Sequence, residues 1–171
     1  MEVSGRLALP AGLRAFASYS FLDATYQSTV LLASALPEPD SARPGDTFPL
    51  SPRHRGTIGI GATRVIKTSV LDGELSLRAV SSQYLRGDDV NRERPLPGYG
   101  VVDLRISLEH ERFAVSASVT NLLDRRYETF GIFALNPKGP LGAPAPAEPT
   151  LERFLNPGYP RALTLSVKAK L

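Results

Sequence analysis

The chain has no cysteine and no tryptophan among its 171 residues. Without cysteine, neither a disulfide framework nor a thiolate-ligated metal site can form. The sequence also has no run of about 18 apolar residues, which is the length that a transmembrane helix needs. A helical membrane span is therefore excluded, whereas a membrane β-strand needs only about 9 to 11 alternating residues.

The charged residues show no excess of one sign along the chain. Twenty lysines and arginines stand among 17 acidic residues, with a formal net charge of +3. They form no basic stripe of the kind that binds nucleic acid, so we expect no nucleic-acid partner. The first six residues lack the basic and apolar regions of a secretory signal. If the protein is exported, we expect the beginning of the protein to be missing from this chain.

The last nine residues alternate strictly between apolar and polar side chains. Leucine, valine and alanine occupy the odd positions, and threonine, serine and lysine occupy the even ones: Leu163, Leu165, Val167, Ala169 and Leu171 against Thr164, Ser166, Lys168 and Lys170. Successive side chains of a strand point to opposite faces, whereas a helix would not separate these residues. The pattern predicts a strand with one apolar face.

Seven segments in all carry this signature of a strand. They are approximately residues 3–9, 13–26, 53–66, 73–84, 99–109, 113–120 and 163–171. In the fifth segment, Val102, Leu104 and Ile106 alternate with Asp103 and Arg105. The short link at 109–112 leaves room only for a hairpin. The predicted fold class is all-β, an antiparallel up-and-down meander of about seven strands.

The connections between these segments alternate in length. The short ones are 10–12, 67–72 and 109–112, and the long ones are 27–52, 87–98 and 134–159. Bacterial outer-membrane barrels show this asymmetry, with short periplasmic turns and long extracellular loops. Aromatic residues gather near the long connections, as an interfacial girdle would: Tyr19, Phe21, Tyr26, Tyr84, Tyr99, Tyr127, Phe130, Phe133 and Tyr159. Two loop segments need separate treatment: 30–33 fits either a strand extension or a packed loop, and the proline-rich 139–146 cannot hold a ladder.

Five short motifs, in this order and spacing, resemble the C-terminal part of the β-barrel of TonB-dependent outer-membrane receptors. They are FASYSFLDA at 16–24, PRH at 52–54, QYLRGDD at 83–89, LPGYGVVDL at 96–104 and TNLLDRRY at 120–127. The chain departs from the family pattern in having Leu123 where phenylalanine is usual. It also ends on Leu171 where the family commonly has an aromatic residue.

This resemblance implies a 22-stranded barrel closed by an N-terminal plug, located in the bacterial outer membrane. It also implies active import of an iron chelate, such as a siderophore, or of a similar scarce nutrient. We expect residues 1–171 to be a C-terminal fragment of the barrel domain, with the plug and the earlier strands absent. The expected partners are outer-membrane lipid, a small-molecule ligand, and the TonB complex through the missing N-terminal part; no cofactor is expected.

No residue of the sequence is assigned a catalytic, cofactor-binding or metal-binding role, and the ligand-binding residues stay unknown. The only histidines, His54 and His110, are predicted to lie at opposite ends of the wall, too far apart for a shared metal or a catalytic pair. The acidic segment 87–91 is interpreted as a solvated loop because it lacks calcium-loop spacing. Asp103 and Arg105 are expected to pack against a plug rather than line a solute path, and 121–127 is interpreted as a structural kink.

Two other classes of protein remain as alternatives. An outer-membrane enzyme of the phospholipase or protease type would need a nucleophile oriented by histidine at one rim of the barrel. Neither histidine has an evident partner, so we favour transport and expect no enzyme activity. A soluble β-barrel binding module would instead turn its apolar face inward.

Overall fold

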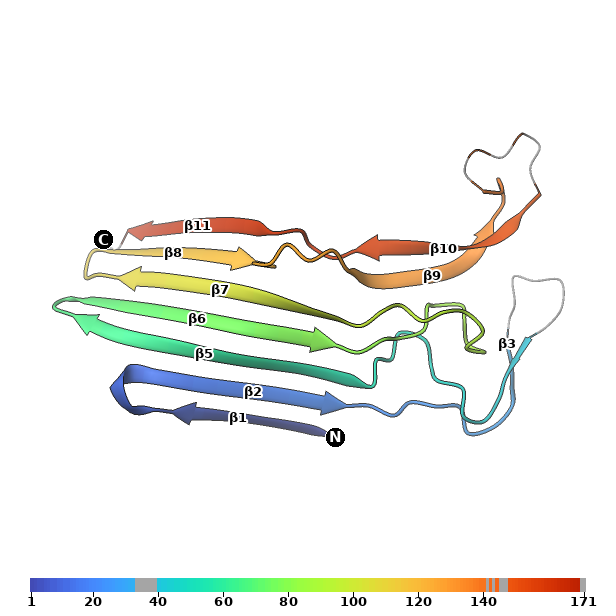
Figure 1. Ribbon diagram of the computed structural model, residues 1–171, viewed down its shortest axis with the longest axis horizontal. Coiled ribbons are helices and arrows are strands. Elements are labelled where there is room, and N and C mark those ends of the chain that lie inside the picture. The colour runs from blue at the N-terminus through green and yellow to red at the C-terminus, as the bar shows by residue number, and fades with distance from the viewer. Residues whose placement is uncertain (33–39, 141, 143, 145–147, 170–171) are drawn as a thin grey trace.

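The computed structural model describes residues 1–32, 40–140, 142, 144 and 148–169. Its main feature is a single antiparallel sheet of seven strands, in the order β1-β2-β5-β6-β7-β8-β11 (Figure 1). The strands are β1 (Glu2–Ala8), β2 (Leu13–Phe21), β5 (His54–Ile66), β6 (Ser69–Val80), β7 (Tyr99–Glu109), β8 (Phe113–Thr120) and β11 (Ala162–Ala169). The all-β meander of about seven strands is confirmed, while a total of 22 strands stays a prediction. Among the described residues, no helix is long and apolar enough to cross a membrane.

Two strands differ from their predicted bounds by more than two residues. The strand β6 covers Ser69–Val80 rather than 73–84, because β5 and β6 stay paired as far as Ile66 and Ser69. Only two residues form this turn, and Lys67 adopts a left-handed conformation there, with φ of 56°. The strand β2 ends at Phe21 rather than near Tyr26. Tyr26 lies in the following loop, where its side chain is buried. At the C-terminus, the predicted positions 170 and 171 lie outside the described residues.

The long connections contain two hairpins. In the first, β3 (Val30–Leu32) pairs with β4 (Asp40–Ala42), so residues 30–32 form a strand, while Ala33 lies outside the described residues. In the last connection, β9 (Glu128–Asn136) pairs with β10 (Thr150–Pro157), where no strand was predicted. Its apolar residues do not follow a period of two, since Phe130, Gly131, Ile132 and Phe133 are consecutive. Of the proline-rich segment 139–146, positions 141, 143, 145 and 146 lie outside the described residues.

The strand register sorts the sheet into two faces. One row of directly paired residues crosses six strands on the polar face: Arg14, Gly61, Glu74, Arg105, Ser118 and Thr164. The neighbouring row, on the apolar face, consists of Leu7, Ala15, Ile60, Leu75, Leu104, Val119 and Leu163. The predicted side-chain directions in β7 and β11 are therefore confirmed. The apolar face is exposed in the described chain, with Leu165 at 69% and Ile60 at 61%.

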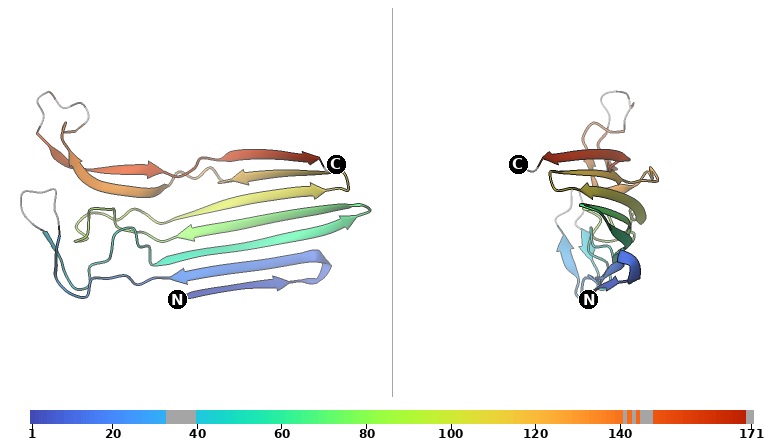
Figure 2. Two further views of the ribbon diagram at one scale, coloured as in Figure 1. Left: turned by 180° about the vertical axis from the view of Figure 1, so that it is seen from behind. Right: turned by 90° about the vertical axis from the view of Figure 1, so that its left-hand side faces the viewer.

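The two ends of the sheet differ (Figure 2). Three short connections lie at one end, hereafter the short-turn end: the 3-10 turn η1 (Pro10–Gly12), residues 67–68 and residues 110–112. All the long connections gather at the other end, hereafter the long-loop end. The most buried apolar side chains include Tyr26, Ala42, Leu85 and Leu96. These lie in the long connections, while Val101 of β7, at 2% exposure, is buried within the sheet, so the described apolar core is formed mainly by the long connections.

Candidate functional site

The first two long connections are joined by side-chain hydrogen bonds. The Tyr26 hydroxyl donates to Asp89 Oδ1 at 2.8 Å, and its ring stacks on Phe48 with centroids 4.1 Å apart. Asn91 completes a two-way contact with Thr47: its Oδ1 accepts from the Thr47 N–H at 2.6 Å, and its Nδ2 donates to the Thr47 carbonyl at 2.9 Å. Residues 22–53 and 81–98 are therefore packed together as far as the structure describes them.

The third long connection is tied to the second through its backbone. The Arg86 N–H donates to the Gly131 carbonyl at 3.0 Å, and the Phe133 N–H donates to the Arg86 carbonyl at 2.8 Å. The Gln83 side chain also donates to the Thr129 carbonyl at 3.2 Å. We use the name loop cluster for the described residues of 22–53, 81–98 and 128–136. These contacts make it a continuous structure across the long-loop end.

The acidic segment 87–91 is folded into the loop cluster, which corrects the prediction of a solvated loop. Asp88 is only 2% exposed, and its carboxylate accepts the N–H groups of Arg92 and Glu93 at 2.9 and 3.0 Å. Burial raises the pKa of Asp88 above its ordinary value. Asp89 and Asn91 are bonded to the neighbouring loop, as described above. Within the described ranges, no group of three or more His, Cys, Asp or Glu residues is arranged to hold a metal ion.

We expect the change Tyr26→Phe to lower the stability of the contact between 22–53 and 81–98 by about 1.5–3 kcal/mol, because it removes a hydrogen bond to a carboxylate. Amide hydrogen exchange should accelerate in both 22–53 and 81–98. The variant Tyr159→Phe is the control, since Tyr159 is 83% exposed. Unchanged exchange in 81–98 would contradict this account of the contact.

The same contact predicts a dependence on pH. Burial, together with the hydrogen bond to Asp89, raises the pKa of Tyr26 from 10.0 to about 12. Because the folded-state pKa lies above the ordinary value, the stabilisation by the neutral phenol is complete below pH 10. It is lost as the pH rises through about 12. The Tyr26→Phe variant has no phenol to ionise, so its free energy of unfolding should not show this loss between pH 10 and about 12.

A groove with a volume of about 660 Å³ opens on the polar face next to the loop cluster. Its lining includes two arginines, one glutamate and several hydroxyl residues: Arg55, Arg78, Glu2, Ser4, Ser18, Ser20 and Thr57. The Arg55 side chain is exposed and has no hydrogen bond or ion pair with any described residue, while the Arg78 guanidinium lies 3.7 Å from the Asp103 carboxylate and its side chain stays 55% exposed. Guanidinium and hydroxyl groups suit an anionic molecule rich in oxygen. No pattern in the sequence indicates this pair of arginines, because only the pairing of β5 with β6 brings them together.

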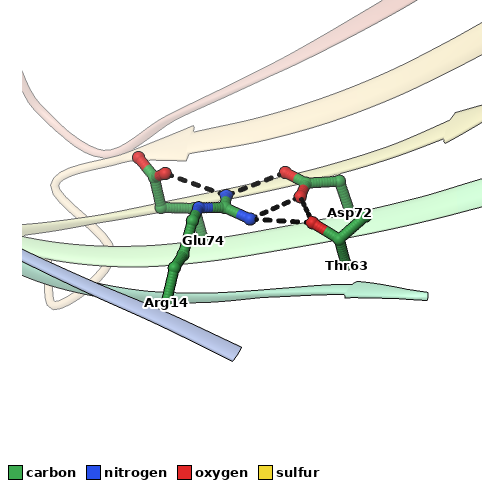
Figure 3. Close-up of polar contacts among 4 residues, drawn as sticks. All are labelled: Arg14, Thr63, Asp72 and Glu74. Carbon is green, nitrogen blue, oxygen red and sulfur yellow. Dashed lines mark hydrogen bonds and ion pairs between the residues drawn. The ribbon is translucent and has the colours of Figure 1, made fainter. Parts of the chain in front are cut away.

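At the short-turn end, Arg14 connects three strands (Figure 3). Its guanidinium donates to both oxygens of Asp72 at 2.6 and 3.0 Å, to Glu74 at 3.0 Å, and to the Thr63 hydroxyl at 3.0 Å. To reach β6 from β2, this side chain lies flat across β5 over Gly61, where a Cβ would overlap the guanidinium. The absence of a side chain at Gly61 therefore allows the Arg14 side chain to cross β5.

Asp103 and Arg105 lie on the polar face, as predicted. Asp103 accepts the backbone N–H of Asn121 at 2.9 Å and pairs with Arg78. Asn121 is 2% exposed; its side chain accepts from the Arg125 N–H at 2.9 Å and donates to the carbonyls of Arg125 and Tyr159 at 2.8 and 3.1 Å. Its φ is 50°. These bonds support the interpretation of 121–127 as a structural kink.

The two histidines lie at opposite ends of the sheet, as predicted. His54 begins β5 at the long-loop end, where its Nδ1 is 2.7 Å from the Tyr19 hydroxyl. His110 is in a short turn, where its Nε2 is 3.1 Å from the Thr68 hydroxyl and its ring stacks on Phe113. Neither contact brings a histidine to a carboxylate, as a catalytic triad would require.

Residues 1–122 match the family model described as TonB dependent receptor-like, beta-barrel. No curated protein matches the sequence significantly. Among solved structures, the chain is similar to the ferric yersiniabactin uptake receptor FyuA from Yersinia pestis, with a TM-score of 0.67 and 17% identity. The match covers 97% of this chain and 22% of that receptor. At this identity the likeness shows a shared fold, and the chain spans about a fifth of the receptor's length.

Proposed function

The chain belongs to the family of TonB-dependent receptor-like β-barrels, and on this premise we propose that it is the C-terminal part of an outer-membrane receptor that imports a small molecule. The observation that carries this proposal is the groove with its two arginines beside the loop cluster. Family membership implies the bacterial outer membrane and a transport protein rather than an enzyme. The plug, the earlier strands and the segment that contacts the TonB complex would belong to the part of the receptor outside residues 1–171.

The two faces of the sheet support a definite orientation. An apolar face with exposed leucine and isoleucine suits the lipid side of a barrel wall, and the face with Arg14, Glu74 and Arg105 suits its lumen. Short turns of bacterial barrels lie in the periplasm and long loops lie outside the cell. The loop cluster is then at the extracellular entrance, and the groove is on the lumen side directly below it.

The groove favours an anionic ligand such as an iron chelate. The Arg55 guanidinium has no partner among the described residues. The Arg78 guanidinium forms an ion pair with Asp103 at 3.7 Å, a distance too long for a hydrogen bond. A guanidinium can bind a carboxylate through two parallel hydrogen bonds. The hydroxyls of Ser18 and Thr57 line the same groove and can bond further oxygen atoms.

The enzyme alternative gains no support from the described residues. Both histidines bond to hydroxyl groups, Tyr19 and Thr68, at opposite ends of the sheet. The soluble-barrel alternative would need the apolar face to enclose a cavity. The exposure of that face and the family match both favour a membrane wall.

The test uses the complete receptor that contains this chain, with ferric citrate as the first anionic probe. The double change Arg55→Gln and Arg78→Gln should weaken binding at least about tenfold, since each charge-assisted hydrogen bond contributes about 1.5–3 kcal/mol. Lys67→Gln, in the turn at the opposite end, is the matched control for the loss of charge. Binding to purified receptor and uptake by cells would both be measured across a panel of anionic and neutral ferric chelates. Equal affinity of the double variant for every chelate that the parent binds would refute the assignment of the groove.

A further inference from the structure

One charged residue interrupts the apolar face of the sheet. Among the described residues of the seven strands, Arg64 is the single Lys, Arg, Asp or Glu on that face. Its neighbour Thr63 points to the polar face, where it bonds to Asp72 at 2.6 Å, so Arg64 lies on the opposite side. Directly across from it are Leu71 and then Leu108. Arg64 is exposed, and its side chain makes no hydrogen bond or ion pair with any described residue.

An apolar groove with a volume of about 410 Å³ lies on the same face, and its lining includes Ala62, close to Arg64 in β5. Small residues form its floor, because Ala62 is paired with Gly73. Larger apolar side chains line it: Leu9, Leu13, Ile60, Leu75, Leu104 and Ile106. A Cβ placed on Gly73 would meet no atom within 4 Å, so the space above it is open. Arg64 is two residues beyond Ala62 in β5, about 7 Å along the strand, which places it at the short-turn end of the groove.

We propose that Arg64 and this groove bind a glycerophospholipid of the membrane leaflet on the short-turn side. The guanidinium binds the lipid phosphate, and one acyl chain lies in the groove over Ala62 and Gly73. This inference rests on the membrane orientation in the proposed function. It adds a defined lipid site to the outer wall, separate from the ligand groove on the polar face.

Both the position and the chemistry of Arg64 favour this occupant. A charge on the lipid side of a barrel is costly near the middle of the membrane and nearly free at its interface. Arg64 is three residues before Lys67 in the hairpin turn, which places it at the interface. A guanidinium matches the geometry of phosphate through bidentate hydrogen bonds. Lipopolysaccharide, in the opposite leaflet, would meet the long-loop end instead.

The experiment again uses the complete receptor, purified in detergent and titrated with dioleoylphosphatidylglycerol. Native mass spectrometry would count the lipid molecules that stay bound. We expect one tightly held lipid on the parent, at least tenfold weaker binding by Arg64→Gln, and a similar loss in Gly73→Leu, whose side chain fills the groove. The matched controls are Lys67→Gln and Gly5→Leu. Gly5 lies on the same face in β1, and a Cβ there also meets no atom within 4 Å.

The two variants and a competing lipid test separate parts of the proposed lipid site. Retention of the lipid by Arg64→Gln at parental affinity would overturn the phosphate contact, and retention by Gly73→Leu would overturn the acyl site. A lipid A probe that competes for the same site with the same sensitivity to Arg64→Gln would overturn the choice of leaflet. A spin label at position 165 separates this inference from the proposed function. If the label contacts lipid while both variants bind normally, only the inference fails; if the label does not contact lipid, the membrane orientation fails with it.

Discussion

Replacing Gly12 with alanine should lower the free energy of unfolding of the barrel by about 2–5 kcal/mol. Gly12 ends the turn η1 with φ of 73°, a left-handed conformation that costs other residues about 1–2 kcal/mol. A Cβ at this position would also overlap the Thr63 carbonyl oxygen, which belongs to the backbone of β5. Relieving that overlap needs a shift of the turn or the strand, for which overpacking costs of about 1–3 kcal/mol are typical.

The measurement is urea unfolding of the complete receptor in detergent, with the folded fraction detected by heat modifiability on gels. Gly5→Ala is the control, since a side chain on Gly5 meets open space. The substitution should also weaken the contact of β2 with β5, because Arg14 donates a hydrogen bond to the Thr63 hydroxyl at 3.0 Å. Amide exchange at the beginning of β2 should therefore rise in Gly12→Ala. Parental stability of this variant would show that the turn tolerates a different backbone path.

Residues 1–171 expressed alone should not form a heat-resistant, monodisperse barrel in detergent. Within the described sheet, β1 and β11 are the outermost strands, each paired along one side only. In a hydrocarbon environment every backbone N–H and C=O needs a partner, and the smallest single-chain bacterial barrels close with eight strands. Two open edges also promote pairing between copies.

Size-exclusion chromatography with light scattering would measure this result. We expect large, polydisperse species, and we expect a discrete monomer when the same residues are part of the complete receptor. A closed monomer formed by residues 1–171 would refute the proposal that this chain is a section of a larger barrel. Because the comparison uses one sequence in two contexts, it isolates the effect of the open edges.

The sheet could be predicted from the sequence because its strands follow a simple period. Leu163, Leu165 and Val167 alternate with polar residues, and the structure pairs them with the apolar positions of β8. The alternation of short and long connections could be predicted for a related reason, since proline, glycine and charged residues interrupt this period. Bounds were less accurate where the pattern weakens, as at the start of β6.

The loop cluster, the groove with Arg55 and Arg78, and the contacts of Arg14 could not be predicted in the same way. The pairing of β9 with β10 depends on register and not on alternation, because apolar residues are consecutive in β9. The contact between Tyr26 and Asp89 joins residues 63 apart in the chain. Arg14 reaches Asp72 over Gly61, and this arrangement needs three strands in register. Such contacts are tertiary, so single segments contain no signal for them.

The loop cluster has one mechanical consequence. Arg86 is bonded to β9, while Asp89 and Asn91, only a few residues further, are bonded to Tyr26 and Thr47. The second long connection therefore links the other two. We expect a displacement of the β9–β10 hairpin to shift the described residues of 22–53 as well. We therefore expect the described parts of the three long connections to move together rather than independently.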